Sequence, residues 1–230
     1  MKRTILCFVL AAFFALPALA AAEVNGVYIA PKFLLGIQDS GGLSKSPDII
    51  DGGFSQHSQV VFGGALAVGY NFAPKWNIPI RAEIEYALRS NSSNSKDGSL
   101  IGGRGNFNWQ TKHTLNVSTL FLNAYFDIAT GTAFTPYIGG GLGMAFNYTS
   151  VKAEVLGRTL ADKSRYDTTF AWNVGAGLAY AFTENISADL GYRFIGTGYR
   201  EVKGDFMGLH ATVGSAPYIH EFYLGARFTF

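Results

Sequence analysis

The stretch Tyr223-Leu-Gly-Ala-Arg-Phe-Thr-Phe230 alternates strictly between two kinds of residue. Every second residue is apolar, and the residues between are small, polar, charged or tyrosine. The two sets are Leu224, Ala226, Phe228 and Phe230, and Tyr223, Gly225, Arg227 and Thr229. Because successive side chains of a β-strand point to opposite faces, the pattern predicts a strand with one apolar face. The sequence ends on the aromatic Phe230, and we expect no further domain after this strand.

The same alternation occurs in eight segments, which predicts an all-β fold. The segments are Val27–Gln38, Phe62–Phe72, Ile78–Arg89, Leu120–Ile128, Ile138–Tyr148, Phe170–Phe182, Ile186–Phe194 and Tyr218–Phe230. The connections alternate in length. Gln38–Gln59, Asn91–Lys112, Thr149–Asp167 and Thr197–Pro217 are long, whereas Ala73–Asn77, Ala129–Thr135 and Thr183–Asn185 are short. Long loops at one end and tight turns at the other are typical of outer-membrane barrels. We therefore expect an eight-stranded antiparallel up-and-down transmembrane β-barrel, with its long loops outside the cell and both termini in the periplasm.

A soluble β-sandwich or lipocalin-like barrel is the alternative, because half-buried strands alternate there too. Two features favour the membrane barrel. The polar faces are mainly Gly, Ala and Asn, which suit a narrow lumen better than a solvated surface. The apolar faces also become aromatic at both ends, as interfacial girdles do. The expected girdles are Tyr70, Phe72, Phe126, Tyr180, Phe182, Phe228 and Phe230 at the periplasmic rim, and Tyr86, Phe146, Tyr148, Phe170, Trp172 and Phe194 at the outer rim.

The fourth segment contains an irregularity. His113–Ser118, just upstream of it, is apolar at Leu115 and Val117 and so runs in the opposite phase. A β-bulge near Ser118, or a departure of the chain from the membrane, would explain the change of phase. The sequence leaves both explanations open.

The N-terminal segment predicts secretion. Lys2 and Arg3 precede an apolar run that ends near Leu16, and Ala18–Ala22 supplies small residues for cleavage. We expect residues 1–22 to be a signal peptide, cleaved after residue 20–22, and residues 23–230 to form the barrel. An uncleaved N-terminal anchor is the alternative. Cys7 is the only cysteine, and its loss with the signal peptide would leave no disulfide or thiol chemistry.

Charged residues on the predicted inward faces are balanced in sign. They are Lys32, Arg81, Arg89, Arg193 and Arg227, against Glu83, Glu85, Asp127, Asp189 and Glu221. An eight-stranded barrel leaves an interior that side chains can fill, so we expect these charges to pair. The main interpretation is a polar plug, and a gated narrow pore is the alternative. Equal numbers of both signs argue against strong ion selectivity.

Four segments carry a resemblance to a known family. They are Arg81–Tyr86, Thr135–Gly143, Asp189–Phe194 and Gly225–Phe230. The chain resembles the small outer-membrane β-barrel family, which includes opacity-type surface antigens, OmpA/OmpX-like barrel domains and "porin family" proteins. The resemblance implies an outer-membrane barrel that serves as surface antigen, adhesin or envelope-stability protein, surrounded by membrane lipid and lipopolysaccharide. It also implies that the C-terminal strand, with Tyr223, Phe228 and Phe230, is recognised by the barrel-assembly machinery.

The sequence offers little support for catalysis or cofactors. His57, His113, His210 and His220 lie in or beside the long connections, without metal-ligand spacing or a converging nucleophile and acid. Removal of Lys2 and Arg3 from the 18 basic residues leaves 16, equal to the 16 acidic residues, so no basic excess suggests nucleic acid. We expect no cofactor, no metal and no enzymatic activity. A lipid-modifying outer-membrane enzyme remains an alternative.

One candidate contact surface lies in the second long connection. Gly102–Trp109 combines Arg104 with Phe107 and Trp109, an aromatic and basic patch. Binding residues concentrate on loops that a rigid scaffold holds. We therefore expect a non-enzymatic barrel whose four outer loops contact a host or surface ligand, with a narrow solute channel as the alternative from another class.

Overall fold

The computed structural model of the protein describes residues 26–39, 44–46, 58–102, 105–155, 158–198, 200–206, 209–215 and 217–230. The expected signal peptide with Cys7, and also His57 and Arg104, lie outside the described residues. Among the described residues, no helix is long and apolar enough to cross a membrane.

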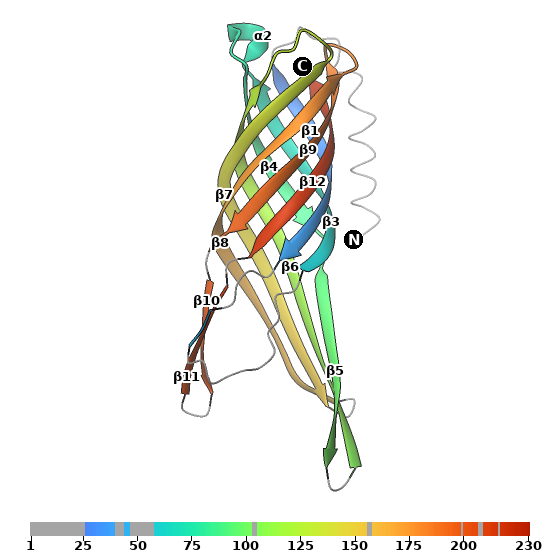
Figure 1. Cartoon of the computed structure of the whole chain (residues 1–230), viewed down its shortest axis with the longest axis vertical. Helices are drawn as coiled ribbons and strands as arrows, with labels where there is room; N and C mark the ends of the chain where they lie inside the picture. Colours follow the sequence, from blue (N-terminus) through green and yellow to red (C-terminus); the bar gives the residue numbers. More distant parts are fainter. Residues whose placement is uncertain are drawn as a thin grey trace.

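Eight antiparallel strands close into a barrel, which confirms the predicted fold class. They are β1 (Val27–Asp39), β3 (Ser58–Asn71), β4 (Ile80–Arg89), β6 (Gly105–Asp127), β7 (Phe134–Val155), β8 (Arg158–Ala181), β9 (Ile186–Thr197) and β12 (Tyr218–Thr229). The sheet order is β4-β3-β1-β12-β9-β8-β7-β6, and β4 also pairs with β6, which closes the ring. Figure 1 shows the tilted strands of this barrel. Closure leaves the barrel section of the sheet without an unpaired edge.

The two faces of the barrel wall are of opposite character. The outward face is apolar, and Leu122 and Leu142 on adjacent strands are 63% and 62% exposed. The inward face carries charged, small and tyrosine side chains, and Glu85 and Glu221 are completely buried there. A large exposed apolar surface around the whole barrel is what a lipid-facing wall requires.

The end with the short connections is compact and aromatic. The β3–β4 connection, which was expected to be short, contains one helical turn, α2 (Ala73–Trp76). Tyr70, Phe72 and Trp76 are in mutual ring contact, with centroids 5.0–5.5 Å apart. The backbone N–H of Phe230 donates to the carbonyl of Val27, so both described ends of the barrel lie here. In Figure 1 this end, with α2 and the C-terminus, is at the top.

The opposite end carries β-hairpins where the sequence analysis expected loops. Strand β5 (Ser92–Gly102) pairs with the first part of β6, and β7 and β8 continue together to Val155 and Arg158. Strands β10 (Arg200–Phe206) and β11 (Leu209–Ser215) form another hairpin, which β2 (Ser44–Ser46) joins as a separate sheet. The hairpins project at the bottom of Figure 1. The expected loop boundaries were therefore wrong, because cross-strand pairing continues well beyond the apolar segments that marked the strands.

The phase change before Leu120 does not come from a bulge in β6, which was one of the two explanations that the sequence left open. Strand β6 pairs with β7 without a register shift from Leu115 to Phe121, so β6 has no bulge near Ser118 in that ladder. The irregularity lies on the other edge of β6, where its partner changes from β4 to β5. Ala87 is paired with Thr119 and Ser92 with Leu115, so the chain from β4 to β5 advances five residues while β6 advances four. Val117 and Phe121 both face inward and are buried. The pattern changes phase because the lumen itself is apolar at this level.

Candidate functional site

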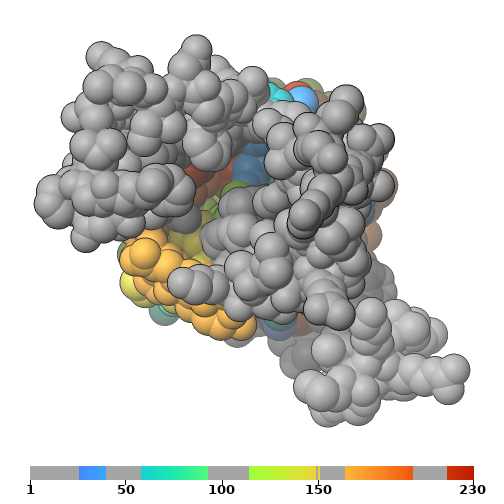
Figure 2. Space-filling view, turned by 90° about the horizontal axis from the view of Figure 1, so that it is seen from below, coloured from blue at the N-terminus to red at the C-terminus, as the bar shows by residue number. Residues whose placement is uncertain are grey.

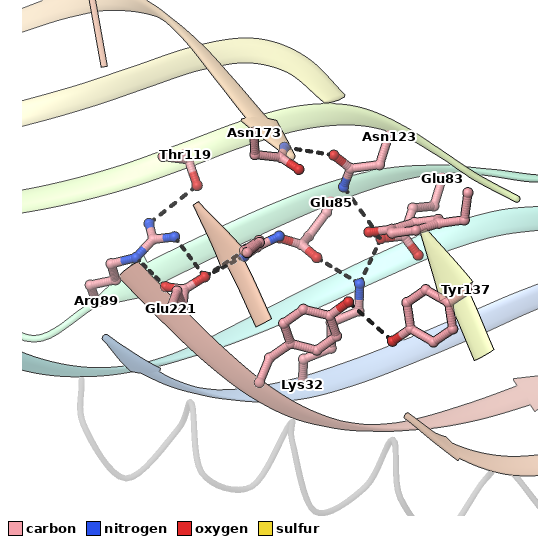
Figure 3. Close-up of polar contacts among 12 residues, drawn as sticks. Lys32, Glu83, Glu85, Arg89, Thr119, Asn123, Tyr137, Asn173 and Glu221 are labelled. Atoms are coloured by element: carbon pink, nitrogen blue, oxygen red, sulfur yellow. Dashed lines mark hydrogen bonds and ion pairs between the residues drawn. The ribbon is translucent and has the colours of Figure 1, made fainter. Parts of the chain in front are cut away.

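The interior contains a continuous chain of six charged groups from four strands (Figure 3). Lys32 Nζ lies 2.6 Å from Glu83 and 2.7 Å from Glu85. Arg193 lies 2.6 Å from both Glu85 and Glu221. Arg89 Nε completes the chain at 2.7 Å from Glu221. Cations and carboxylates alternate along it, so each group except the two ends has an opposite charge on either side.

Two further ion pairs lie toward the end with the short turns. Arg81 Nε donates to both carboxylate oxygens of Asp127, at 2.8 and 3.0 Å. Arg227 Nη2 lies 3.6 Å from Asp189. All ten charges named in the sequence analysis thus lie in ion pairs, nine of them buried and Asp127 half-buried. Removal of one partner of such a pair leaves an uncompensated charge, which typically costs about 3–5 kcal/mol.

Tyrosines pack around the charges and need glycines opposite them. Each of the four inward tyrosines lies directly across from a glycine of the neighbouring strand. A Cβ atom added to that glycine would overlap the tyrosine ring. The pairs are Tyr28–Gly69, Tyr125–Gly139, Tyr137–Gly177 and Tyr223–Gly191. The rings also lie over cations; for example, Lys32 Nζ is 5.4 Å from the ring centroid of Tyr223. The sequence shows that the inward faces are rich in glycine, but the match of each glycine to a tyrosine on the neighbouring strand depends on the strand register.

Hydrogen bonds tie the ion chain to the barrel wall. Glu83 accepts hydrogen bonds from Tyr28 at 3.1 Å, from Tyr125 at 2.9 Å and from Asn123 at 3.3 Å. Asn173 in turn donates to Asn123 at 2.9 Å. A small cavity remains among Lys32, Arg81, Glu83, Tyr125, Tyr137, Asp189 and Tyr223, with room for about one water molecule. The polar interior is therefore nearly filled.

An apolar layer, which was not predicted from the sequence, lies between the ion chain and the hairpin end. Its buried members are Val117, Phe121, Ala145, Ala171, Ile195 and Ile219. Phe121 and Ile195 have almost no exposed surface. Sequence alone gave little sign of this layer, because its members come one or two at a time from five strands. Together with the ion chain, it fills the lumen with side chains at two successive levels.

The three histidines in the described residues lie on different strands and do not gather into a site. His220 faces outward, and its Nδ1 lies 2.6 Å from the hydroxyl of Tyr192. The rings of Phe194 and Tyr218 also contact it. His113 lies in β6 and His210 in β11. Among the described residues, no group of three or more His, Cys, Asp or Glu side chains could hold a metal ion.

The candidate loop contacts lie in the β5–β6 hairpin. Phe107 is paired with Leu100, and Trp109 lies between Gly98 of β5 and Val155 of β7. Arg104 lies outside the described residues. Seen from the hairpin end, residues of β8 border a hollow through which deeper parts of the barrel wall are visible (Figure 2).

Similarity to known proteins agrees with this architecture. The outer membrane protein beta-barrel domain family matches residues 6–230. Outer membrane protein PagN of Salmonella typhimurium is 29% identical over 184 residues, which cover 77% of this chain and 77% of PagN. Outer membrane protein P.IIC of Neisseria gonorrhoeae is 27% identical, over 59% of this chain and 64% of its own length. The crystal structure of Neisserial surface protein A is similar in fold, with a TM-score of 0.50 and 20% identity over 91% of this chain and 100% of that one.

Proposed function

Because this chain belongs to the outer membrane protein beta-barrel domain family, we propose that it is a non-enzymatic surface protein that binds ligands through its projecting hairpins. One observation carries the proposal: the lumen is filled by ion pairs and an apolar layer, whereas several hairpins project from one end. A barrel with a filled lumen supports its hairpins rigidly and leaves little space for a solute to pass. Surface antigen, adhesion and envelope-integrity roles all use such a support.

The orientation is part of the proposal. The hairpin end faces out of the cell, and both ends of the barrel lie in the periplasm. The short turns at residues 128–133 and 182–185, opposite the long hairpins, support this arrangement. A cysteine at the exposed Ser164 of β8 should react with a membrane-impermeant maleimide on intact cells. A cysteine at Glu184, in a short turn, should react only after the outer membrane is permeabilised. The reverse pattern would contradict the orientation.

The β5–β6 hairpin is the first candidate for ligand contact. It extends the sheet formed by β6, β7 and β8, so the barrel wall supports its base. Arg104, Phe107 and Trp109 would supply charge and aromatic surface, the residue types that dominate contact energies at interfaces. The ligand would be a host protein or a component of a neighbouring cell surface.

Hairpin trimming tests this proposal once a ligand is found. The purified barrel is first screened against extracellular-matrix proteins and lipopolysaccharide. Replacement of residues 94–113 by Asn-Gly would join the cross-strand partners Ser93 and Thr114 through a two-residue turn. The matched control replaces residues 202–213 by Asn-Gly between Glu201 and Gly214. We expect both variants to fold, and only the first to lose binding. Unchanged binding by the first variant would exclude this hairpin as the contact surface.

We also propose that the protein has no enzymatic activity. The only hydrogen-bond partner that the described residues give His220 is Tyr192, which supplies no carboxylate to orient a general base. Expression of the barrel should leave the mass spectrum of lipid A unchanged. A deacylated or acylated lipid A species that appears only with the expressed protein would support the alternative of a lipid-modifying enzyme.

A further inference from the structure

The outward aromatic surface of β7 and β8 continues beyond Phe146 and Phe170 toward the hairpin tips, and it includes Tyr148 of the expected outer girdle. On β7 and β8, Phe146, Phe170 and Trp172 face outward and are exposed. Further toward the hairpin tips, Tyr148 and Tyr166 are directly opposed across the two strands. Their rings lie 4.7 Å apart between centroids, at an angle of 43°. Tyr166 is 81% exposed, the highest value of any large exposed hydrophobic residue among those described.

The Tyr148–Tyr166 pair continues the lipid-facing surface. Tyr166 and Phe170 are four residues apart on β8, so their side chains point to the same face of the strand. Tyr148 and Phe146 share a face of β7 in the same way. Within the described residues, neither phenol hydroxyl makes a hydrogen bond to the protein. The pair is therefore an outward aromatic surface with hydrogen-bonding groups available to a ligand.

Height above the membrane decides which ligand the pair can meet. Four residues of strand span about 14 Å, or about 10 Å along the barrel axis at a tilt of about 40°. Phospholipid headgroups extend only about 5–7 Å beyond the hydrocarbon. With Phe170 at the hydrocarbon boundary, Tyr166 would stand above phospholipid headgroups. In that placement, a membrane lipid needs a head taller than that of a phospholipid to contact Tyr166.

The chemistry of this surface fits sugar better than phosphate. Ser150, Ser164 and Thr168 occupy outward positions next to the pair, and they supply hydroxyl groups without charge. Arg165 and Asp167 alternate with these residues and belong to the other face of β8. Aromatic rings pack on the apolar C–H faces of sugars, while hydroxyls exchange hydrogen bonds with sugar hydroxyls.

We propose that the Tyr148–Tyr166 pair binds the saccharide head of a glycolipid in the outer leaflet. The lipid's acyl chains would lie along the apolar wall below, beside Phe170 and Trp172. This inference rests on the orientation proposed above, with the hairpin end outside the cell. It is independent of the proposed ligand binding by the β5–β6 hairpin. The outer-leaflet glycolipid would thus bind specifically to the side of the barrel formed by β7 and β8.

The test compares lipopolysaccharide retained by barrels purified from outer membranes in mild detergent. Tyr166→Ala removes an exposed ring, and the heat-modifiability of the variant confirms that it folds. Tyr180→Ala is the matched control, because Tyr180 also faces outward and pairs with Phe134 and Phe182, but at the opposite rim. We expect Tyr166→Ala to retain roughly threefold to tenfold less lipopolysaccharide per barrel. Tyr166→Phe, which keeps the ring, should retain most of it, and Tyr180→Ala should match wild type.

Three results would overturn the proposal. Equal retention by wild type and Tyr166→Ala would show that the pair contributes nothing. Loss in Tyr180→Ala but not in Tyr166→Ala would show that the orientation is reversed, whatever the hairpins bind. Soluble, deacylated core oligosaccharide is compared with intact lipopolysaccharide as a competitor for binding. If the two compete equally well, the ligand is a free glycan and not a membrane glycolipid.

Discussion

Tyr223 of β12 lies directly opposite Gly191 of β9, and its ring occupies the space that a side chain on residue 191 would need. The ring cannot easily move aside, because Tyr223 is buried, its hydroxyl lies 3.1 Å from that of Tyr137, and Lys32 lies over its face. Three other tyrosine–glycine pairs repeat the arrangement. Glycine is thus required at these positions for space, and tyrosine fills the space that it leaves.

Substitution of this glycine should therefore destabilise the barrel. We expect Gly191→Ala to lower the free energy of unfolding by about 1–3 kcal/mol, the usual cost of overpacking a filled interior. Urea unfolding in lipid vesicles measures the change. Gly64→Ala is the control, because the nearest heavy atom to its added Cβ would be 3.7 Å away. Its stability should change by about 0.5 kcal/mol or less. Equal effects of the two substitutions would contradict the proposed role of the tyrosine–glycine pairs.

The ion chain should be most sensitive at its centre. Arg193 bridges Glu85 and Glu221, so Arg193→Ala leaves two buried carboxylates with one cation each. We expect a loss of about 3–5 kcal/mol in the free energy of unfolding. Glu184→Ala, in an exposed turn, should have little effect. If Arg193→Ala unfolds at the same urea concentration as wild type, the interior charges do not hold the barrel together. Glu83→Ala should also be destabilised, because Lys32 would then keep only Glu85.

Most of the barrel could be predicted from the sequence, because alternation with period two directly reports which face meets lipid. The inward positions of Lys32, Glu83 and Arg193 followed from that alternation alone. Their partners did not, since Arg89 and Glu221 are 132 residues apart in the chain and meet only through the closure of the ring. Closure and strand register are properties of the whole sheet, and no local pattern records them.

The hairpins were the part that alternation could not reveal. Above the membrane both faces of a strand meet water, so the apolar face that marks a strand disappears. Residues such as Ser95 and Lys112 are paired across β5 and β6, yet their sequence is typical of a loop. The inward apolar layer was missed for the opposite reason. Val117 and Phe121 are apolar on a face that was expected to be polar, so the pattern was interpreted as a bulge or as a departure of the chain from the membrane.

The filled lumen predicts a barrel that does not conduct. Wild-type protein in planar bilayers should pass no steady current, because the ion chain and the apolar layer occupy successive levels of the lumen. Phe121→Ala combined with Arg193→Ala removes one buried side chain from the apolar layer and one from the ion chain, and it should raise the conductance above that of wild type. Leu122→Ala is the control, because Leu122 faces lipid. A steady current through the wild-type barrel would favour the narrow channel that the sequence analysis kept as an alternative.

The C-terminal aromatic should matter for assembly more than for stability. Phe230 lies at the rim, where its backbone N–H donates to Val27, while Phe228 is paired with Ile29. A charged residue near the membrane interface costs only about 0–1 kcal/mol, so Phe230→Asp should refold into lipid vesicles nearly as well as wild type. In cells, we expect severalfold less heat-modifiable barrel in the outer membrane, because the assembly machinery would no longer recognise the strand. Tyr223→Ala is the comparison variant. It removes a buried ring and should weaken both refolding and assembly, whereas Phe230→Asp should weaken assembly alone. Normal levels of Phe230→Asp in the outer membrane would exclude Phe230 as an assembly signal.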